Sequence, residues 1–140
     1  MMYFAYHALY SLGATEVYQL KPTNDPETEE EFQTLVYDSP NPISWQDYLV
    51  AEAAVKQRIG VEKIRIYRNK HLTETDWIMT TDNTNSIQNI QEWINYRQTL
   101  RDLPSNPPIF VWKNGELDIS QMTLPERPQI IRNPSQQQAP

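Results

Sequence analysis

The 140-residue sequence contains no cysteine and only three glycines. Without cysteine, the chain has neither disulfides nor thiolate metal sites. With so few glycines it has no glycine-rich loop for phosphate groups, and no Gly-x-Ser-x-Gly turn positions a nucleophile. No apolar run approaches the roughly 20 residues that a membrane helix needs. We therefore expect a soluble, non-catalytic protein with no cofactor, no metal site and no membrane contact, whose function depends on packing and surfaces.

The charge distribution is also one-sided, because 12 Lys and Arg oppose 18 Asp and Glu and give a net charge of −6. Nucleic-acid binding relies on many basic side chains that neutralise phosphates, so the sequence argues against it. An acidic run lies between Asp25 and Glu31. Half of the basic residues lie close together, and a solvated loop and a solvated helix face are the simplest interpretation of the two groups: Lys56, Arg58, Lys63, Arg65, Arg68 and Lys70.

Residues 1–42 predict a β-rich N-terminal unit. Residues 15–21 and 32–37 are rich in β-branched and aromatic side chains, and turn-forming residues separate them. The apolar segment 1–10 predicts a buried strand or a short helix. The acidic run before Phe32 leaves a short helix as an alternative there, because negative charge stabilises a helix N-terminus.

A first helix is expected to begin at Ser44, which with Asp47 resembles a capping box after the stop at Pro40 and Pro42. Gly60 predicts a bend or an end, since glycine costs about 1 kcal/mol relative to alanine inside a helix. Residues 63–67 alternate in a way that also fits a strand. The expected buried face of this helix has five large side chains: Trp45, Tyr48, Leu49, Val55 and Ile59.

A second helix is expected from Asn85 or Ser86 to about Leu103, where Pro104 ends it. Its apolar arc is wider than one partner helix needs. One surface therefore packs within the chain, and the other either does the same or binds another protein. The two adjacent surfaces are Ile87, Ile90 and Ile94, and Trp93, Tyr96, Leu100 and Leu103.

Arg97 and Arg101 lie one helical turn apart, so together they can hold a carboxylate. Asp76 is the candidate within the chain, if the turn that begins at Thr75 folds back over the second helix. This arrangement is either a folding device or part of a partner-binding surface. The only histidines are His7, expected in the core, and His71, expected at the surface or as a cap because no third metal-ligating residue has a recognised spacing.

The C-terminal part predicts a hairpin, because Asn114-Gly115 separates residues 109–112 from residues 117–119. After residue 121 the chain is rich in Pro and Gln and cannot order alone, so we expect a partner to hold it. The predicted fold is α+β, with a central two-helix core, a β-rich N-terminal unit, a C-terminal β-hairpin and an extended tail. The predicted domains are residues 1–42, 43–121 and 122–140.

Two short motifs, in order, resemble the bacteriophage tail assembly chaperone family, a module also found in tail-fibre proteins. The resemblance covers about residues 65–112, although Lys113 stands where such proteins often have proline. Its residues are Arg68-Asn69, Leu72, Thr75-Asp76-Trp77, Trp93, Tyr96-Arg97-Gln98 and Leu100-Arg101-Asp102-Leu103-Pro104.

The resemblance implies a phage protein that binds tail, baseplate or tail-fibre proteins, in the host cytoplasm during assembly or in the virion tail. A permanent virion subunit is the alternative, and an envelope-polysaccharide-degrading enzyme or a small regulatory module is less favoured. A homo-oligomer is a further option. We predict partner contacts at Trp77, Trp93, Tyr96, Arg97, Leu100 and Arg101, and a structural motif at Thr75, Asp76, Asp102, Leu103 and Pro104.

Overall fold

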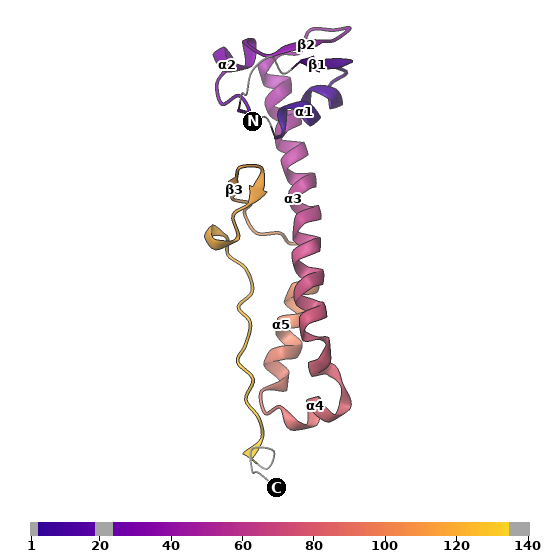
Figure 1. The fold of residues 1–140 in the computed structure, drawn as a ribbon, viewed down its shortest axis with the longest axis vertical. Coiled ribbons are helices and arrows are strands. Elements are labelled where there is room, and N and C mark those ends of the chain that lie inside the picture. Colours follow the sequence, from indigo (N-terminus) through magenta and orange to yellow (C-terminus); the bar gives the residue numbers. More distant parts are fainter. Residues whose placement is uncertain (1–2, 19–23, 135–140) are drawn as a thin grey trace. The chain divides into compact units, whose positions relative to one another are not determined.

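A computed structural model describes residues 3–18 and 24–134 (Figure 1). The chain has an α+β architecture in which helices predominate and two small antiparallel sheets pair β1 with β2 and β3 with β4. Contacts divide it into two compact units. Unit 1 comprises Met1–Gly60 and Trp112–Leu117, and unit 2 comprises Val61–Val111 and Asp118–Pro140. Among the described residues, no helix is long and apolar enough to cross a membrane.

The N-terminal part of unit 1 has more helix than strand, which corrects the expected β-rich unit. It contains α1 (Ala5–Ser11) and α2 (Glu29–Gln33), with β1 (Glu16–Tyr18) antiparallel to β2 (Val36–Asp38). The short-helix alternative is therefore right for the acidic run. The hydroxyl of Thr28 accepts from the Glu31 amide at 3.2 Å and caps α2, whose first turn is acidic. The first expected strand extends to residue 21, and its residues 19–21 lie outside the described residues.

The core of unit 1 forms where α1, β1, α2 and the first turns of α3 (Trp45–Thr75) meet. The Asp25 carboxylate accepts from the amides of Tyr3, Phe4 and Ala5 at 2.8–3.1 Å and so satisfies donors at the start of α1. His7, expected in this core, is exposed. The buried side chains are mostly small or aromatic: Ala5, Ala8, Leu9, Ala14, Val17, Phe32, Ile43, Tyr48 and Ala51.

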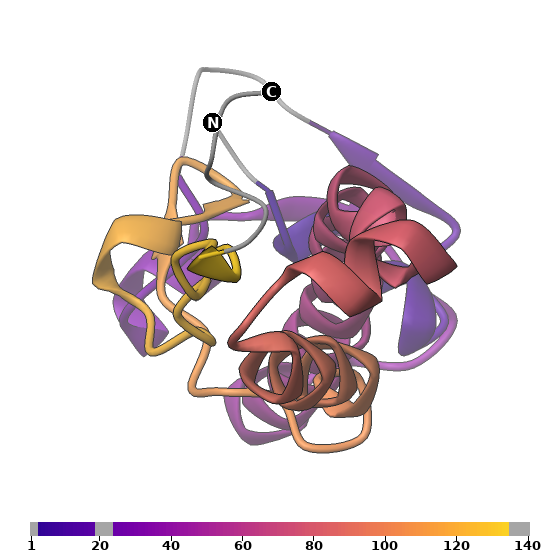
Figure 2. The ribbon, with the colours of Figure 1, turned by 90° about the horizontal axis from the view of Figure 1, so that it is seen from below.

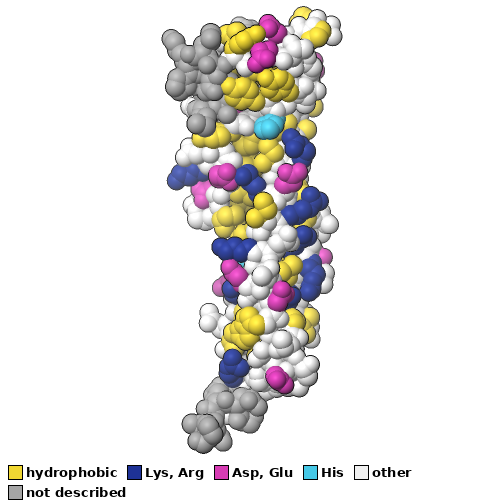
Figure 3. Space-filling model, turned by 45° about the vertical axis from the view of Figure 1, so that its right-hand side comes forward, with side chains coloured by type: hydrophobic (Ala, Val, Ile, Leu, Met, Phe, Trp, Pro, Cys, Tyr) yellow, Lys and Arg dark blue, Asp and Glu magenta, His cyan; other side chains and the backbone are white. Residues whose placement is uncertain are grey.

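Helix α3 begins where the capping pattern predicted, because Ser44 Oγ accepts from the Asp47 amide at 3.0 Å. The helix continues through Gly60 without interruption, and residues 63–67 are helical rather than extended. Good helix formers on both sides outweigh the cost of one glycine. The six basic residues from 56 to 70 lie on this helix, and Figure 3 shows basic side chains interspersed with acidic ones rather than in one continuous patch.

In unit 2, the end of α3 leads through η1 (Asp76–Met79) and α4 (Thr81–Ser86) to α5 (Ile90–Asp102). Helix α5 lies beside α3 (Figures 1 and 2). Its end agrees with the Pro104 stop, but it begins later than the expected Asn85 or Ser86. The intervening backbone is extended at Ile87, which forms an antiparallel bridge with Arg132.

The hairpin pairs β3 (Trp112–Lys113) with β4 (Glu116–Leu117) around Asn114 and Gly115, whose φ angles are 52° and 79°. Positive φ at both positions is typical of the predicted type I′ turn. The return strand is shorter than expected, because η2 (Ile119–Gln121) begins soon after Leu117. The hairpin belongs to unit 1, where the Trp112 ring packs edge-on against Phe4 at 4.8 Å between centroids.

Residues 129–133 form hydrogen bonds with residues 86–89 of the same unit, so the expectation that a partner holds the tail is wrong for this segment. The Gln88 amide donates to the Ile131 carbonyl at 2.6 Å, and the Asn133 amide donates to the Ser86 carbonyl at 2.9 Å. The Asn89 side chain adds bonds to the Gln129 carbonyl and the Ile131 amide at 2.6 and 3.0 Å. Backbone pairing, rather than apolar burial, therefore orders this polar stretch.

Candidate functional site

Arg97 lies on the buried face of α5 and joins this helix to the end of α3 and the start of η1 by hydrogen bonds. Its residue exposure is only 5%. One terminal nitrogen donates to the Leu72 carbonyl at 2.8 Å and to Thr75 Oγ1 at 2.6 Å, and the other donates to Asp76 Oδ1 at 2.7 Å. Carbonyls in the last turn of a helix lack partners within the helix. The fork of the guanidinium therefore satisfies the end of α3 and fixes the start of η1.

The two side chains that accept hydrogen bonds from Arg97 differ in their exposure to solvent. The side chain of Asp76 is 63% exposed, so solvent weakens its ion pair with Arg97. Thr75 is 1% exposed, and its bond to Arg97 lies in the interior. Arg101, one turn further along α5, is exposed, so the carboxylate of Asp76 is held by Arg97 rather than by both arginines.

Helix α5 buries one of its two predicted apolar surfaces and leaves the other partly open. Trp93 and Tyr96 pack edge to face at 5.9 Å between ring centroids, and Leu100 has no exposed surface. Ile94, on the adjacent surface, is 41% exposed. The structure thus places four of the predicted partner-binding residues in the interior of unit 2 and leaves Trp77 and Arg101 at its surface; contact with a partner stays a prediction. The four interior residues are Trp93, Tyr96, Arg97 and Leu100.

The residues predicted to form the structural motif lie at the two helix ends. Asp102 is the last residue of α5, and its carboxylate accepts from Gln98 at 3.0 Å. Its carbonyl accepts from the amides of Ser105 and Asn106 at 3.1 and 3.0 Å. Leu103 is the C-cap, 6% exposed, and Pro104 follows it. The bonds from Ser105 and Asn106 satisfy the Asp102 carbonyl at the end of α5.

His71 belongs to a polar cluster that joins α3 to the C-terminal segment of unit 2. One Arg127 nitrogen lies 2.6 Å from His71 Nδ1 and 2.8 Å from Glu74 Oε2. Arginine only donates, so His71 Nδ1 is the acceptor and the ring proton is on Nε2. Burial, followed by the positive charge of Arg127, lowers the pKa of His71, while Glu74 opposes the shift. Burial and Arg127 therefore both favour the neutral form of the ring.

This cluster predicts a pH dependence of stability. Because folding lowers the pKa of His71, the unfolded chain binds more protons than the folded chain between the two pKa values. The free energy of unfolding therefore keeps the full contribution of neutral His71 above about pH 6.5 and loses it as the pH falls toward the pKa of the folded state. Arg127→Gln should raise the pKa of His71 in an NMR titration of its ring protons. A lower or unchanged pKa in that variant would contradict the assignment.

A groove of about 460 Å³ opens beside this cluster. The end of α3, η1, Trp93 of α5 and residues 127–130 line it. Trp77 and Ile130 are 42% and 40% exposed there, so two large apolar side chains face solvent at the groove. Arg127 and Ile130 were not predicted as site residues. The available signal was a basic residue and two adjacent isoleucines, Ile130 and Ile131, within a Pro/Gln-rich segment.

Unit 2 has a further groove of about 720 Å³ between the end of α5 and residues 121–125. It contains Leu103 but none of the exposed motif residues, so we take the groove at Trp77 as the candidate site. In the described ranges, 3–18 and 24–134, no three His, Asp or Glu residues come together as metal ligands.

Comparison with known proteins supports the resemblance seen in the sequence. Residues 61–129 match the family model of the phage tail assembly chaperone protein. A search of curated proteins and a search of solved structures each gave no match. The matched segment contains the Arg97 network, Trp77 and part of the C-terminal segment that lines the groove. Over residues 61–129 the chain is therefore similar to the phage tail assembly chaperone family.

Proposed function

We propose that this chain is a non-catalytic phage tail protein that binds a tail or tail-fibre protein during virion assembly, and that the groove at Trp77 contacts this client. The observation that carries the proposal is the exposure of Trp77 in a groove within the family segment. Tryptophan is enriched in the energetically dominant parts of protein interfaces. The family match supports a role in tail assembly.

The surroundings of Trp77 fit a preformed binding surface. Arg97 holds the side chain of Asp76, the first residue of η1, and Trp77 is the next residue of this helix. The hydrogen bond therefore restrains the backbone that carries Trp77. Arg127 and Glu74 pair at 2.8 Å at the groove, which leaves the rim polar and its charges satisfied. A rigid surface loses little conformational entropy when it binds. The groove therefore combines an apolar anchor with a polar rim.

Replacement of Trp77 by alanine should weaken client binding by about tenfold or more, because loss of an aromatic anchor removes much of an interface's energy. Binding would be measured by titration calorimetry of the full chain against tail and tail-fibre proteins of the same phage. Ile66→Ala is the matched control, since Ile66 is a 69% exposed apolar residue of the same unit that does not line the groove. Equal affinities for both variants would refute the placement of the site.

Mass spectrometry of purified virions separates a transient chaperone from a permanent subunit. Our proposal of an assembly factor predicts that the chain is found with its client in the host cytoplasm and is absent from purified particles. Stoichiometric presence in particles would instead establish the alternative, a structural subunit of the baseplate or tail fibre.

A further inference from the structure

We infer that unit 1 contains a second protein-binding site, a groove that takes a basic polypeptide segment of a partner through an Arg or Lys side chain. The groove has a volume of about 700 Å³ and is formed by α2, β2 and the loop that leads into α3. Its lining residues fall between positions 29 and 45, outside the family segment 61–129. The inference is therefore independent of the function proposed for unit 2.

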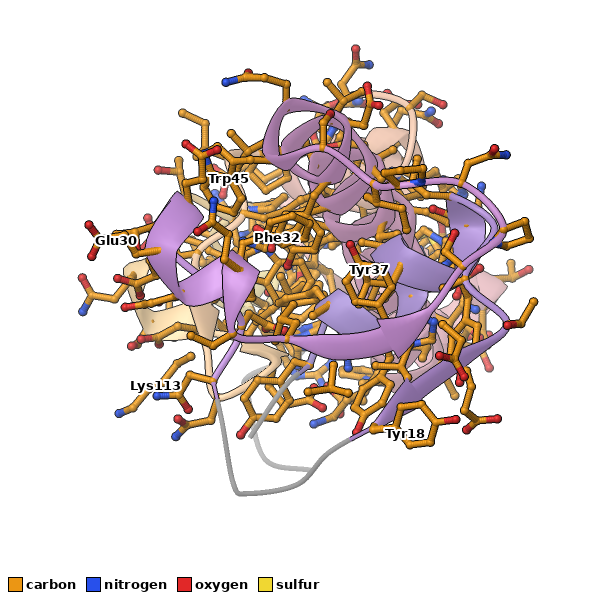
Figure 4. The ribbon with its side chains drawn as sticks, turned by 90° about the horizontal axis from the view of Figure 1, so that it is seen from above. Tyr18, Glu30, Phe32, Tyr37, Trp45 and Lys113 are labelled. Atoms are coloured by element: carbon orange, nitrogen blue, oxygen red, sulfur yellow. The ribbon has the colours of Figure 1, made fainter. Side chains whose placement is uncertain are left out.

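Aromatic rings form the apolar part of the groove. Phe32 lies 5.6 Å from Trp45 and 6.3 Å from Tyr37 between ring centroids, and all three line it. Trp45 also stacks on buried Tyr48 with an interplanar angle of 13°, which fixes its orientation. In Figure 4, Phe32 and Tyr37 lie toward the inside of unit 1, whereas Glu30 points away from it. Phe32 is buried, whereas Tyr37 and Trp45 are half-buried, and the exposed face of a fixed ring can bind a cationic side chain.

The net negative charge of the protein falls in unit 1, which contains this groove. Unit 1 has 4 Lys or Arg against 10 Asp or Glu, whereas unit 2 has 8 of each, so the whole net charge of −6 falls in unit 1. No Lys or Arg occurs between residues 24 and 55, the stretch that supplies every lining residue. The potential around the groove therefore favours a cationic segment over a neutral or acidic one.

Glu29 is the acidic residue that lines the groove. Three other carboxylates of unit 1 are engaged in the fold: Asp25 caps α1, Glu31 accepts from the Glu27 amide, and Glu52 pairs with Lys56 at 2.9 Å. In the part of the chain that the structure describes, no Lys or Arg pairs with Glu29. Its carboxylate is thus available to a cation from another molecule.

The remaining walls suit the stem and backbone of such a segment. Pro40 and Pro42 present apolar surface to the groove, against which the aliphatic stem of Arg or Lys can pack. Ser39 also lines it, and its hydroxyl oxygen is buried without a hydrogen-bond partner among the described residues. A buried, unpaired hydroxyl is costly unless a ligand group satisfies it. Arg is preferred over Lys, because a guanidinium both stacks on rings and pairs with carboxylates.

The inference can be tested with the full chain and a short, fluorescently labelled peptide in which arginine alternates with alanine and proline. Fluorescence anisotropy should show saturable binding that weakens between about 0.05 and about 0.5 M NaCl, where screening becomes strong. The same peptide with glutamine in place of arginine should bind at least about tenfold more weakly. Equal binding of the two peptides, or no binding of the arginine peptide, would overturn the inference.

A charge-reversal pair locates the binding. Glu29→Lys should weaken the binding of the arginine peptide about tenfold, because an attractive contact in the groove becomes repulsive. Glu16→Lys changes the net charge by the same amount at an exposed position of unit 1 outside the groove, and should change affinity less than about twofold. Circular dichroism would verify that both variants fold. Equal losses would show a general charge effect and refute the groove as the site.

Discussion

Replacement of Arg97 by alanine is expected to lower the free energy of unfolding by about 2–4 kcal/mol. The change leaves the Leu72 carbonyl and the Thr75 hydroxyl without their guanidinium donor in the interior of unit 2. The estimate lies below the full cost of a broken buried ion pair, because the Asp76 side chain is 63% exposed. Urea denaturation followed by circular dichroism measures the loss.

Arg101→Ala is the matched control for this prediction, since Arg101 lies on the same helix one turn away and is exposed. Its effect on stability should stay within about 0.5 kcal/mol. Arg97→Lys should fall in between, because an ammonium keeps the charge but lacks the fork that reaches three acceptors. If the two alanine variants are equally stable, the assigned role of the Arg97 network is wrong.

Leu100→Ala should destabilise the protein by about 2–5 kcal/mol, because it leaves a cavity at a position with no exposed surface. Leu100 follows Trp93 and Tyr96 along the buried face of α5. The loss of packing should reduce the denaturant midpoint with little change in the slope of the transition. Urea denaturation of the two proteins under identical conditions provides the comparison.

Ile94→Ala distinguishes the two apolar surfaces of α5. Ile94 is 41% exposed, so its truncation should cost less than about 1 kcal/mol. Comparable losses for Leu100→Ala and Ile94→Ala would mean that both surfaces are packed in the folded protein. The difference that we expect would leave the Ile94 surface open to solvent.

Features that depend on neighbouring residues were predictable from the sequence. Ser44 begins α3 because its hydroxyl bonds to an amide three residues away. Asn114 and Gly115 form the hairpin turn because both adopt positive φ. Pro104 ends α5 because it has no amide hydrogen with which to continue the helix, whereas Leu103 before it keeps helical φ and ψ angles of −52° and −45°. The link between Arg97 and Asp76 was also foreseen, since both belong to motifs whose order suggested a turn that folds back.

Apart from the link between Arg97 and Asp76, the contacts between residues far apart in the sequence were not predictable. The backbone of Ser86 and Gln88 pairs with residues more than forty positions later, which displaces the start of α5 to Ile90. Gly60 lies within α3 because the helix is stabilised over its whole length and not residue by residue. Arg127 reaches His71 across 56 positions, and local patterns contain no information on such a contact. Residues 127–130 also line the groove at Trp77, so the groove could not be foreseen either.

The most direct test of our account is size-exclusion chromatography of the full chain co-expressed with tail and tail-fibre proteins of the same phage. We expect the chain to elute in a complex with one of these proteins, and we expect Trp77→Ala, but not Ile66→Ala, to release it as a folded protein. Elution apart from every tail and tail-fibre protein, or an equally stable complex with Trp77→Ala, would contradict our account.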